Sequence, residues 1–184
     1  MRYSFMEDLS LHILDVAENG ISAGATVISI AIEENTVTDW LTIVIEDNGK
    51  GMSSEFLEKV LDPFVTTRLT RKVGLGLSLF QQSAVEADGD LRVESESGIG
   101  TKVVVGMRYG HIDRKPMGDM GATMLTLIEG NPSVDFIYNH RKDSKVYCLD
   151  TREIRSELGD VPLNHPQVVT LIKNNLAEGL REID

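Results

Sequence analysis

The first regular pattern in the chain has helical spacing. Apolar residues follow one stripe of a helix predicted over residues 7–22: Leu9, Ile13, Val16 and Gly20. A second stripe is polar, with members at alternating spacings of four and three residues: Asp8, His12, Asp15, Asn19 and Ser22. The pattern therefore predicts an amphipathic first helix with a line of polar groups along it.

Alternating, β-branched segments follow this helix. Residues 25–34 and 39–47 predict two strands joined by a turn that begins at Glu34. The next predicted elements are a short helix capped by Ser53 or Ser54, a loop over 62–73, a helix opened by Gly74-Leu75-Gly76, and strands over 90–96 and 101–109. This order predicts an α/β (α+β) two-layer sandwich with a mostly antiparallel sheet.

The pattern is less regular from residue 111 onward. Residues 111–121 predict a linker, and residues 122–130 fit either a helix or a strand. Two segments, 134–138 and 145–149, predict a hairpin that turns around His140–Asp143. Residues 165–183 predict an amphipathic helix with one apolar face: Val169, Ile172, Leu176 and Leu180. We therefore expect a domain over residues 1–110 and a small C-terminal α+β extension over 111–184.

Composition narrows the classes of partner. The net charge of −11 over 184 residues repels nucleic acid and anionic lipid, so neither is expected as a partner. The single cysteine, Cys148, cannot form an internal disulfide, which favours a reducing compartment. The N-terminal residues do not fit a secretory signal, and no apolar run approaches the ~20 residues of a membrane span. We expect a cytoplasmic protein.

Asp15 and Asn19 are the first candidates for chemistry. At a spacing of four they project from one face of the predicted helix. The amide oxygen of Asn19 suits Mg²⁺, a hard cation that keeps several waters and bridges to phosphates. The carboxylate of Asp15 could orient or deprotonate a nucleophile. The alternative for this pair is an ordinary solvated helix face.

Three glycine-containing segments add further candidates. Asp47-Asn48-Gly49-Lys50-Gly51 could accept from an exocyclic amine and let the backbone approach a flat ring, or could be an Asn-Gly hairpin turn. Segment 64–77 carries Arg68, Arg71 and Lys72 before a glycine-rich helix start, which fits a lid over phosphates or an ordinary exposed loop. It is neither a Walker loop nor a dinucleotide fingerprint. Gly98–Thr101 could complete a base pocket or be a common hairpin.

The order and spacing of these motifs resemble the GHKL ATPases, the superfamily of gyrase, heat-shock chaperone ATPases, histidine kinases and mismatch-repair ATPases. The matching segments are LDVAENG (N box), Asp47-x-Gly49-x-Gly51 (first glycine box), Asp62-Pro63-Phe64 with Thr66-Thr67-Arg68 (F box of histidine kinases), Gly74-x-Gly76-Leu77 (second glycine box) and Gly100-Thr101 (last box). The resemblance covers roughly the first 110 residues and implies the Bergerat, histidine-kinase-like ATPase fold.

The resemblance implies ATP and Mg²⁺ as cofactors and assigns roles to the motif residues. Asn19 would ligate Mg²⁺, Asp47 would bind the adenine amine, and Thr101 would lie near the base. Other implied nucleotide-binding residues are Gly49, Gly51, Gly74, Gly76 and Leu77 around the pocket, and Thr67, Arg68 and Lys72 near the phosphates. Asp15 stands where ATP-hydrolysing members carry a water-activating Glu, and it is our candidate catalytic residue.

The chain departs from complete sensor kinases, because no helical hairpin with a phosphoacceptor histidine fits before the first helix. The expected acceptor therefore lies on a partner protein, as for the stand-alone anti-sigma-factor serine kinases. An ATP-driven conformational switch and a non-catalytic ATP sensor remain open. Residues 112–184 fit either a packing or dimerisation element or a docking module. We expect His12 at the surface, although it could position Asp15, and we also expect His111, His140 and His165 there.

Overall fold

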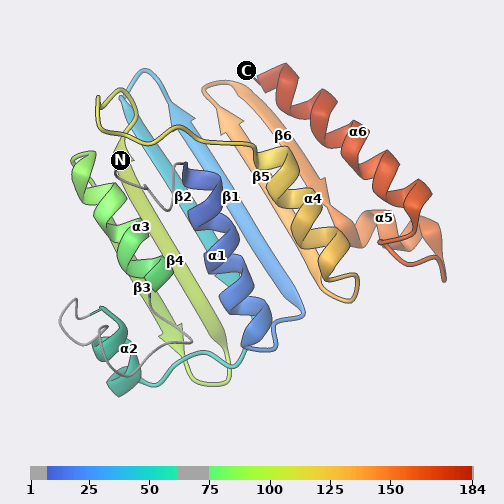
Figure 1. Ribbon diagram of the computed structural model, residues 1–184, viewed down its shortest axis with the longest axis horizontal. Helices are drawn as coiled ribbons and strands as arrows, with labels where there is room; N and C mark the ends of the chain where they lie inside the picture. The colour runs from blue at the N-terminus through green and yellow to red at the C-terminus, as the bar shows by residue number, and fades with distance from the viewer. Residues whose placement is uncertain (1–7, 62–74, 184) are drawn as a thin grey trace, which may run out of the picture.

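The computed structural model describes residues 8–61 and 75–183, which form one sheet with helices packed on one face (Figure 1). The strands are β1 (Val27–Asn35), β2 (Trp40–Asp47), β3 (Asp90–Glu96), β4 (Gly100–Arg108), β5 (Asp135–Lys142) and β6 (Lys145–Asp150). The helices are α1 (Leu9–Ser22), α2 (Ser54–Leu61), α3 (Leu75–Glu86), α4 (Met120–Gly130), α5 (Thr151–Leu158) and α6 (Pro166–Ile183). Among these helices, none combines the length and apolarity that crossing a bilayer requires.

The sheet has six strands in the order β3-β4-β2-β1-β5-β6. All neighbouring pairs are antiparallel except β1 and β5, which run parallel from the Val27–Asp135 pair to the Glu34–Lys142 pair. The predicted hairpin of β5 and β6 is present and continues the sheet of the first 110 residues. The division of the chain into two domains at residue 110 stays a prediction.

The core lies between the sheet and the helices. Every second residue of β1 and β2 is buried against the helices, namely Ile28, Ile30, Ile32, Leu41, Ile43 and Ile45. The alternate residues of both strands are half-buried or exposed, because none of the described helices covers the other face of the sheet (Figure 1). This alternation confirms the predicted two-layer sandwich with a mostly antiparallel sheet.

Several elements after residue 111 differ in detail from the predictions. Residues 122–130 belong to a helix, α4, and α5 was not predicted. Helix α6 buries Ile172 and Leu176 as predicted, but it buries Val168 rather than Val169. Strand β5 continues to Lys142, so the turn is tighter than predicted and His140 lies within the strand.

The surface prediction is wrong for two histidines. His12 is 1% exposed because α1 packs between α3 and α4, and its ring stacks on Phe80 with centroids 4.9 Å apart. Its Nε2 lies 3.1 Å from Oγ of Ser83 on α3. His140 is 5% exposed because it lies on the helix-covered face of β5. His165 is exposed as predicted, and His111 is half-buried.

Candidate functional site

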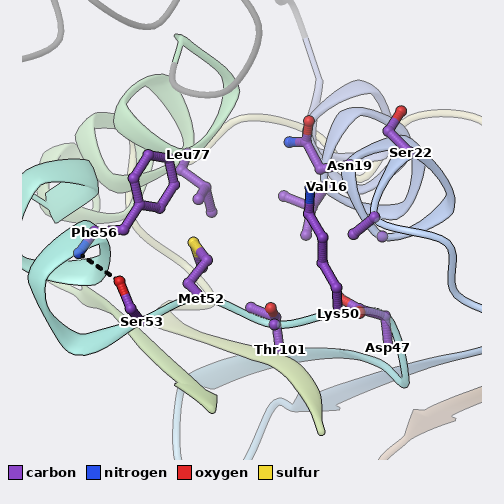
Figure 2. A pocket seen from close by; sticks show the side chains of 13 residues that line it. Val16, Asn19, Ser22, Asp47, Lys50, Met52, Ser53, Phe56, Leu77 and Thr101 are labelled. Carbon is purple, nitrogen blue, oxygen red and sulfur yellow. Dashed lines mark hydrogen bonds between the residues drawn. The ribbon is translucent and has the colours of Figure 1, made fainter. Parts of the chain in front are cut away.

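A cavity of about 420 Å³ lies where α1, α2 and α3 meet the ends of β2 and β4. Its apolar lining comes from five side chains: Val16, Ala23, Met52, Phe56 and Leu77. Its polar lining includes Asn19, Asp47, Lys50, Ser53 and Thr101. Figure 2 shows Asp47 and Thr101 on one side of the cavity and the side chain of Phe56 on another. The volume and the mixed lining are typical of a small-molecule site.

Asp47 is the carboxylate among the described residues that line this cavity. It ends β2, and its Oδ1 accepts from the N–H of Gly49 at 2.8 Å. Gly20 of α1 lets the helix approach, since a Cβ there would lie 2.9 Å from Cβ of Asp47. Burial raises the pKa of the Asp47 carboxyl, and the N–H groups of Gly49 and Thr101 partly oppose this. Asp47 therefore offers a desolvated acceptor to a ligand amine.

Asn48 holds the loop after Asp47 in place. Its Oδ1 accepts from the N–H groups of Thr26 and Val27 at 2.8 and 2.9 Å, and its amide donates to Thr26. Gly51 has φ of 63°, and a Cβ there would lie 2.0 Å from the carbonyl oxygen of Glu96. The chain continues to α2, so the Asn-Gly hairpin alternative is wrong and the loop instead forms one wall of the cavity.

Ser95 is a positioning residue that sequence reasoning missed. Its hydroxyl accepts from the N–H of Met52 and donates to the carbonyl of Gly100, both at 2.9 Å. The Thr101 hydroxyl lies 2.9 Å from Oγ of Ser95, and it must donate because the Ser95 proton is already used. Ser95 thus ties the cavity loop to β4. Its signal in the sequence is a polar residue in phase with Leu91 and Val93, which are buried on β3.

Asp15 and Asn19 take different positions along α1. Asn19 lines the cavity, and its side-chain amide makes no hydrogen bond with another described residue. Asp15 is not among the described lining residues, and a Cβ at Gly76 would lie 1.4 Å from its Oδ2. The Asp15 carboxylate therefore packs against the first turn of α3. Burial raises the pKa of this carboxyl.

The structure brings five of the predicted site residues to one cavity: Asn19, Asp47, Gly51, Leu77 and Thr101. Gly49 lies beside the Asp47 carboxylate, and Gly76 lies beside that of Asp15. Other predicted positions lie outside the described residues, namely the loop over 62–73, Asp62-Pro63-Phe64, Thr66, Thr67, Arg68, Arg71, Lys72 and Gly74.

The cavity also contains groups that sequence reasoning did not single out. Met52 and Phe56 add apolar surface, and Lys50 adds a positive charge. Figure 2 shows the Lys50 side chain extending from the loop toward the α1 side of the cavity. Lys50 forms no ion pair with another described residue.

Within residues 8–61 and 75–183, no group of three or more His, Cys, Asp or Glu could hold a metal ion. Mg²⁺ in nucleotide sites takes few protein ligands, because it keeps several waters and binds ligand phosphates. The side-chain amide of Asn19, which bonds to no other described residue, lines the cavity and offers the kind of oxygen ligand that Mg²⁺ takes.

Comparison with known proteins decides the family. The sequence profile described as histidine kinase-, DNA gyrase B- and HSP90-like ATPase matches residues 7–110. The chain belongs to this ATPase family. The five predicted residues that line the cavity all fall within the matched segment.

The relatives of this ATPase-family chain include histidine kinases, and they are much longer proteins. It is 32% identical over 93 residues to sporulation kinase D of Bacillus subtilis and to a putative sensor protein of Shewanella frigidimarina, covering 50% of this chain. The match spans only 18% and 14% of those two proteins, respectively. The N-terminal domain of a DNA repair protein has the same fold, with a TM-score of 0.51 and 17% identity, over 79% of this chain and 53% of that one.

Proposed function

We propose that this protein binds MgATP in the cavity and transfers the γ-phosphoryl group to a side chain of a partner protein. The observation that carries the proposal is the half-buried Asp47 carboxylate in an apolar cavity that Asn19 also lines. The Asp47 carboxylate can accept a hydrogen bond from the adenine amine at one end of MgATP. The Asn19 amide oxygen can ligate Mg²⁺ at the phosphate end, and both residues line the same cavity. Membership of the ATPase family supports ATP as the nucleotide.

In this proposal the adenine ring lies among Val16, Met52 and Leu77, and its exocyclic amine donates to Asp47. Thr101 lies beside Asp47 in the register of β2 and β4, so its hydroxyl can contact the same edge of the base. Guanine carries a carbonyl where adenine carries this amine, and a carboxylate repels a carbonyl oxygen. Asp47 would therefore select adenine over guanine.

The phosphates would extend toward Asn19. Mg²⁺, when bound, would neutralise charge on the β- and γ-phosphates, with the Asn19 amide oxygen as its protein ligand. Lys50 would add a cation from the loop side of the cavity. Thr67, Arg68 and Lys72, with the glycine backbone at Gly74, remain the proposed phosphate contacts from the segment between α2 and α3.

Asp15 is the proposed catalytic residue. Its carboxylate lies one helical turn from Asn19, and burial raises its pKa, which makes it a stronger base than an exposed aspartate. It would take the proton of the acceptor hydroxyl as the phosphoryl group transfers. Asp15 is not among the described residues that line the cavity. Its role therefore requires that the bound phosphates or the acceptor reach the first turn of α3.

Two other functions compete with transfer to a partner. The family description as ATPases favours hydrolysis that drives a conformational step, with Asp15 activating water. The position of Asp15 outside the cavity lining favours a non-catalytic ATP sensor.

We further propose a cytoplasmic location, where the free thiol of Cys148 stays reduced. Residues 111–184 would serve as a packing or homodimerisation element or as a docking module.

Calorimetric titration with MgATP tests the nucleotide site. Asp47→Asn should abolish binding, and Asn19→Ala should remove its dependence on Mg²⁺. Glu46→Gln is the matched control, because Glu46 is the exposed neighbour on the opposite face of β2. Wild-type protein that takes up no ATP at millimolar concentration would contradict the site.

Labelling with γ-³²P-ATP then separates the three functions. Label on a co-purifying protein, lost in Asp15→Asn, supports transfer to a partner. Release of free phosphate without a labelled protein supports hydrolysis instead. A wild-type protein that binds ATP but shows neither outcome is a sensor, and the kinase proposal fails.

A further inference from the structure

A second cavity, of about 450 Å³, lies at the opposite end of the sheet from the nucleotide cavity. It is formed by the ends of β1 and β5, the loop before α4, the first turn of α4 and the last turns of α6. Strand β1 spans the two sites, because Ile28 pairs with Asp47 whereas Glu34 lines the second cavity. Six residues of strand separate these positions by about 20 Å. None of the described lining residues is shared between the two cavities.

Glu34 is an exception to the pattern of β1. The residues of β1 that face the helices are Ile28, Ile30, Ile32 and then Glu34. Glu34 is only 7% exposed, although a fourth apolar residue would continue the core. Burying a carboxylate costs free energy unless the group is paired and hydrogen-bonded. The hydrogen-bond partners of Glu34 therefore indicate the role of a carboxylate at this position.

A chain of hydrogen bonds links Glu34 to His140 and Tyr138 in the core. Oε1 of Glu34 lies 2.6 Å from Nε2 of His140, and Nδ1 of His140 lies 2.8 Å from the hydroxyl of Tyr138. Both nitrogens of the imidazole are therefore engaged, which fixes the orientation of the ring and of the carboxylate. Tyr138 is fully buried and His140 is 5% exposed, so this line is part of the rigid interior.

Within the described part of the chain, only one oxygen of Glu34 has a hydrogen-bond partner. Oε1 makes the contact with His140, and no described residue bonds to Oε2. Glu34 lines the cavity, and among the described residues only His140 is bonded to its carboxylate. A carboxylate that His140 holds in place on a cavity wall can accept a further hydrogen bond from a ligand donor.

The charges around the cavity favour a cationic donor. The first turn of α4 would favour an anion through its free N–H groups, but Asp119 already caps it by accepting from the N–H of Ala122 at 2.8 Å. Asp119 also lines the cavity, so two carboxylates face it. The remaining walls include Met120, Leu180 and Ile183, which suit an alkyl chain.

We propose that this second cavity binds a small organic cation, with an ammonium or guanidinium group donating to Oε2 of Glu34 and an alkyl portion against Met120, Leu180 and Ile183. The chemistry is that of a free alkylamine or of a lysine or arginine side chain. This site does not depend on the proposed kinase activity, because it shares neither residues nor reaction with the nucleotide cavity.

Titration of the full chain tests the site directly, with calorimetry and amide chemical shifts as readouts. The probes are n-butylammonium and n-butylguanidinium, with 1-butanol and butyrate as the neutral and anionic comparisons. At least one cationic probe should bind, and butyrate should not. Glu34→Gln keeps an acceptor for His140 but removes the charge, and it should weaken the cation by about tenfold or more. Glu33→Gln is the matched control, because Glu33 is exposed on the other face of β1.

A second variant covers the case in which Glu34→Gln is unstable. Leu180→Trp enlarges a wall residue while leaving Glu34 intact, so it should block the cation without removing the carboxylate. Thermal unfolding checks that each variant is folded. The proposal is overturned if neither cation binds, if butyrate binds as tightly as butylammonium, or if folded Glu34→Gln and Leu180→Trp both retain wild-type affinity.

The two sources of the cation are separated by a third probe, N-acetyl-lysine amide. Binding tighter than that of butylammonium assigns the cavity to a side chain of a protein. Weaker binding assigns it to a free amine, because the capped backbone then fails to fit at the entrance. Either assignment holds only if Glu34→Gln also weakens binding of the cation, as the proposal predicts.

Discussion

The carboxylate of Asp15 rests directly against Gly76, since a Cβ at Gly76 would lie 1.4 Å from Oδ2 and 2.6 Å from Cγ of Asp15. Asp15 belongs to α1 and Gly76 to the first turn of α3. The contact therefore joins Asp15, the proposed catalytic residue, to α3. This helix follows the segment that carries the proposed phosphate contacts Thr67, Arg68 and Lys72. Any side chain at position 76 must displace the carboxylate or separate the two helices.

Gly76→Ala should destabilise the protein by about 1–3 kcal/mol, the usual cost of inserting an atom into a packed contact. Asp15→Ala should restore most of this loss, because the nearest remaining Asp15 atom, Cβ, would lie 3.4 Å from the new methyl group. Urea unfolding of the two single variants and the double variant measures the coupling. Purely additive effects would contradict the contact.

Gly20 has the corresponding role beside Asp47. Gly20→Ala would place a methyl group 2.9 Å from Cβ of Asp47 and 3.2 Å from its Oδ2, so the carboxylate must move. We expect MgATP affinity to fall about tenfold or more, because the adenine acceptor is displaced. Gly130→Ala is the control, since no atom lies within 4 Å of its added Cβ. Calorimetry of both variants checks this, and equal affinities would rule out the Gly20 contact as a determinant.

The sequence predicted what depends on local periodicity. The alternation in β1 and β2 and the glycine-containing segments around Asp47 and Thr101 each carry their signal within a few residues. The parallel pairing of β1 with β5 joins segments about 100 residues apart, and it depends on how α4 packs rather than on either strand alone. The burial of His12 was missed for the same reason, because α3 covers this residue only when the chain is folded.

Asp15→Asn should raise the stability of the nucleotide-free protein at neutral pH. Burial raises the pKa of the folded Asp15 carboxyl above 3.8, so folding favours the protonated form. The stabilisation from this group is present below pH 3.8 and is lost as the pH rises through the folded pKa. The variant and wild type should therefore converge in unfolding free energy near pH 3.8 and diverge above it. Urea unfolding across this range tests the sign, and a less stable variant at pH 7 would contradict it.

His12 should make stability fall in mild acid. Burial lowers its pKa from 6.5 to about 4, so the folded protein keeps a neutral ring while the unfolded chain takes up a proton. Stability from this group is complete above pH 6.5 and is lost as the pH falls toward 4, by about 3 kcal/mol.

The variant His12→Phe isolates this effect, because phenylalanine can stack on Phe80 but does not titrate. Its unfolding free energy should depend less on pH between 6.5 and 4 than that of the wild type. His165→Gln is the control, because His165 is exposed and its replacement should leave the pH dependence unchanged. An identical pH dependence in His12→Phe and wild type would show that His12 is not the responsible group.

The pairing of β1 with β5 has a consequence for any attempt to isolate the nucleotide-binding segment. A protein cut after residue 110 would lose β5, and β1 would present eight residues of open backbone, from Val27 to Glu34, to solvent. Such an edge pairs readily with another chain. Residues 111–184 therefore protect the β1 edge from self-association, and the shortened protein should form aggregates or strand-exchanged dimers even where its ATP site is intact.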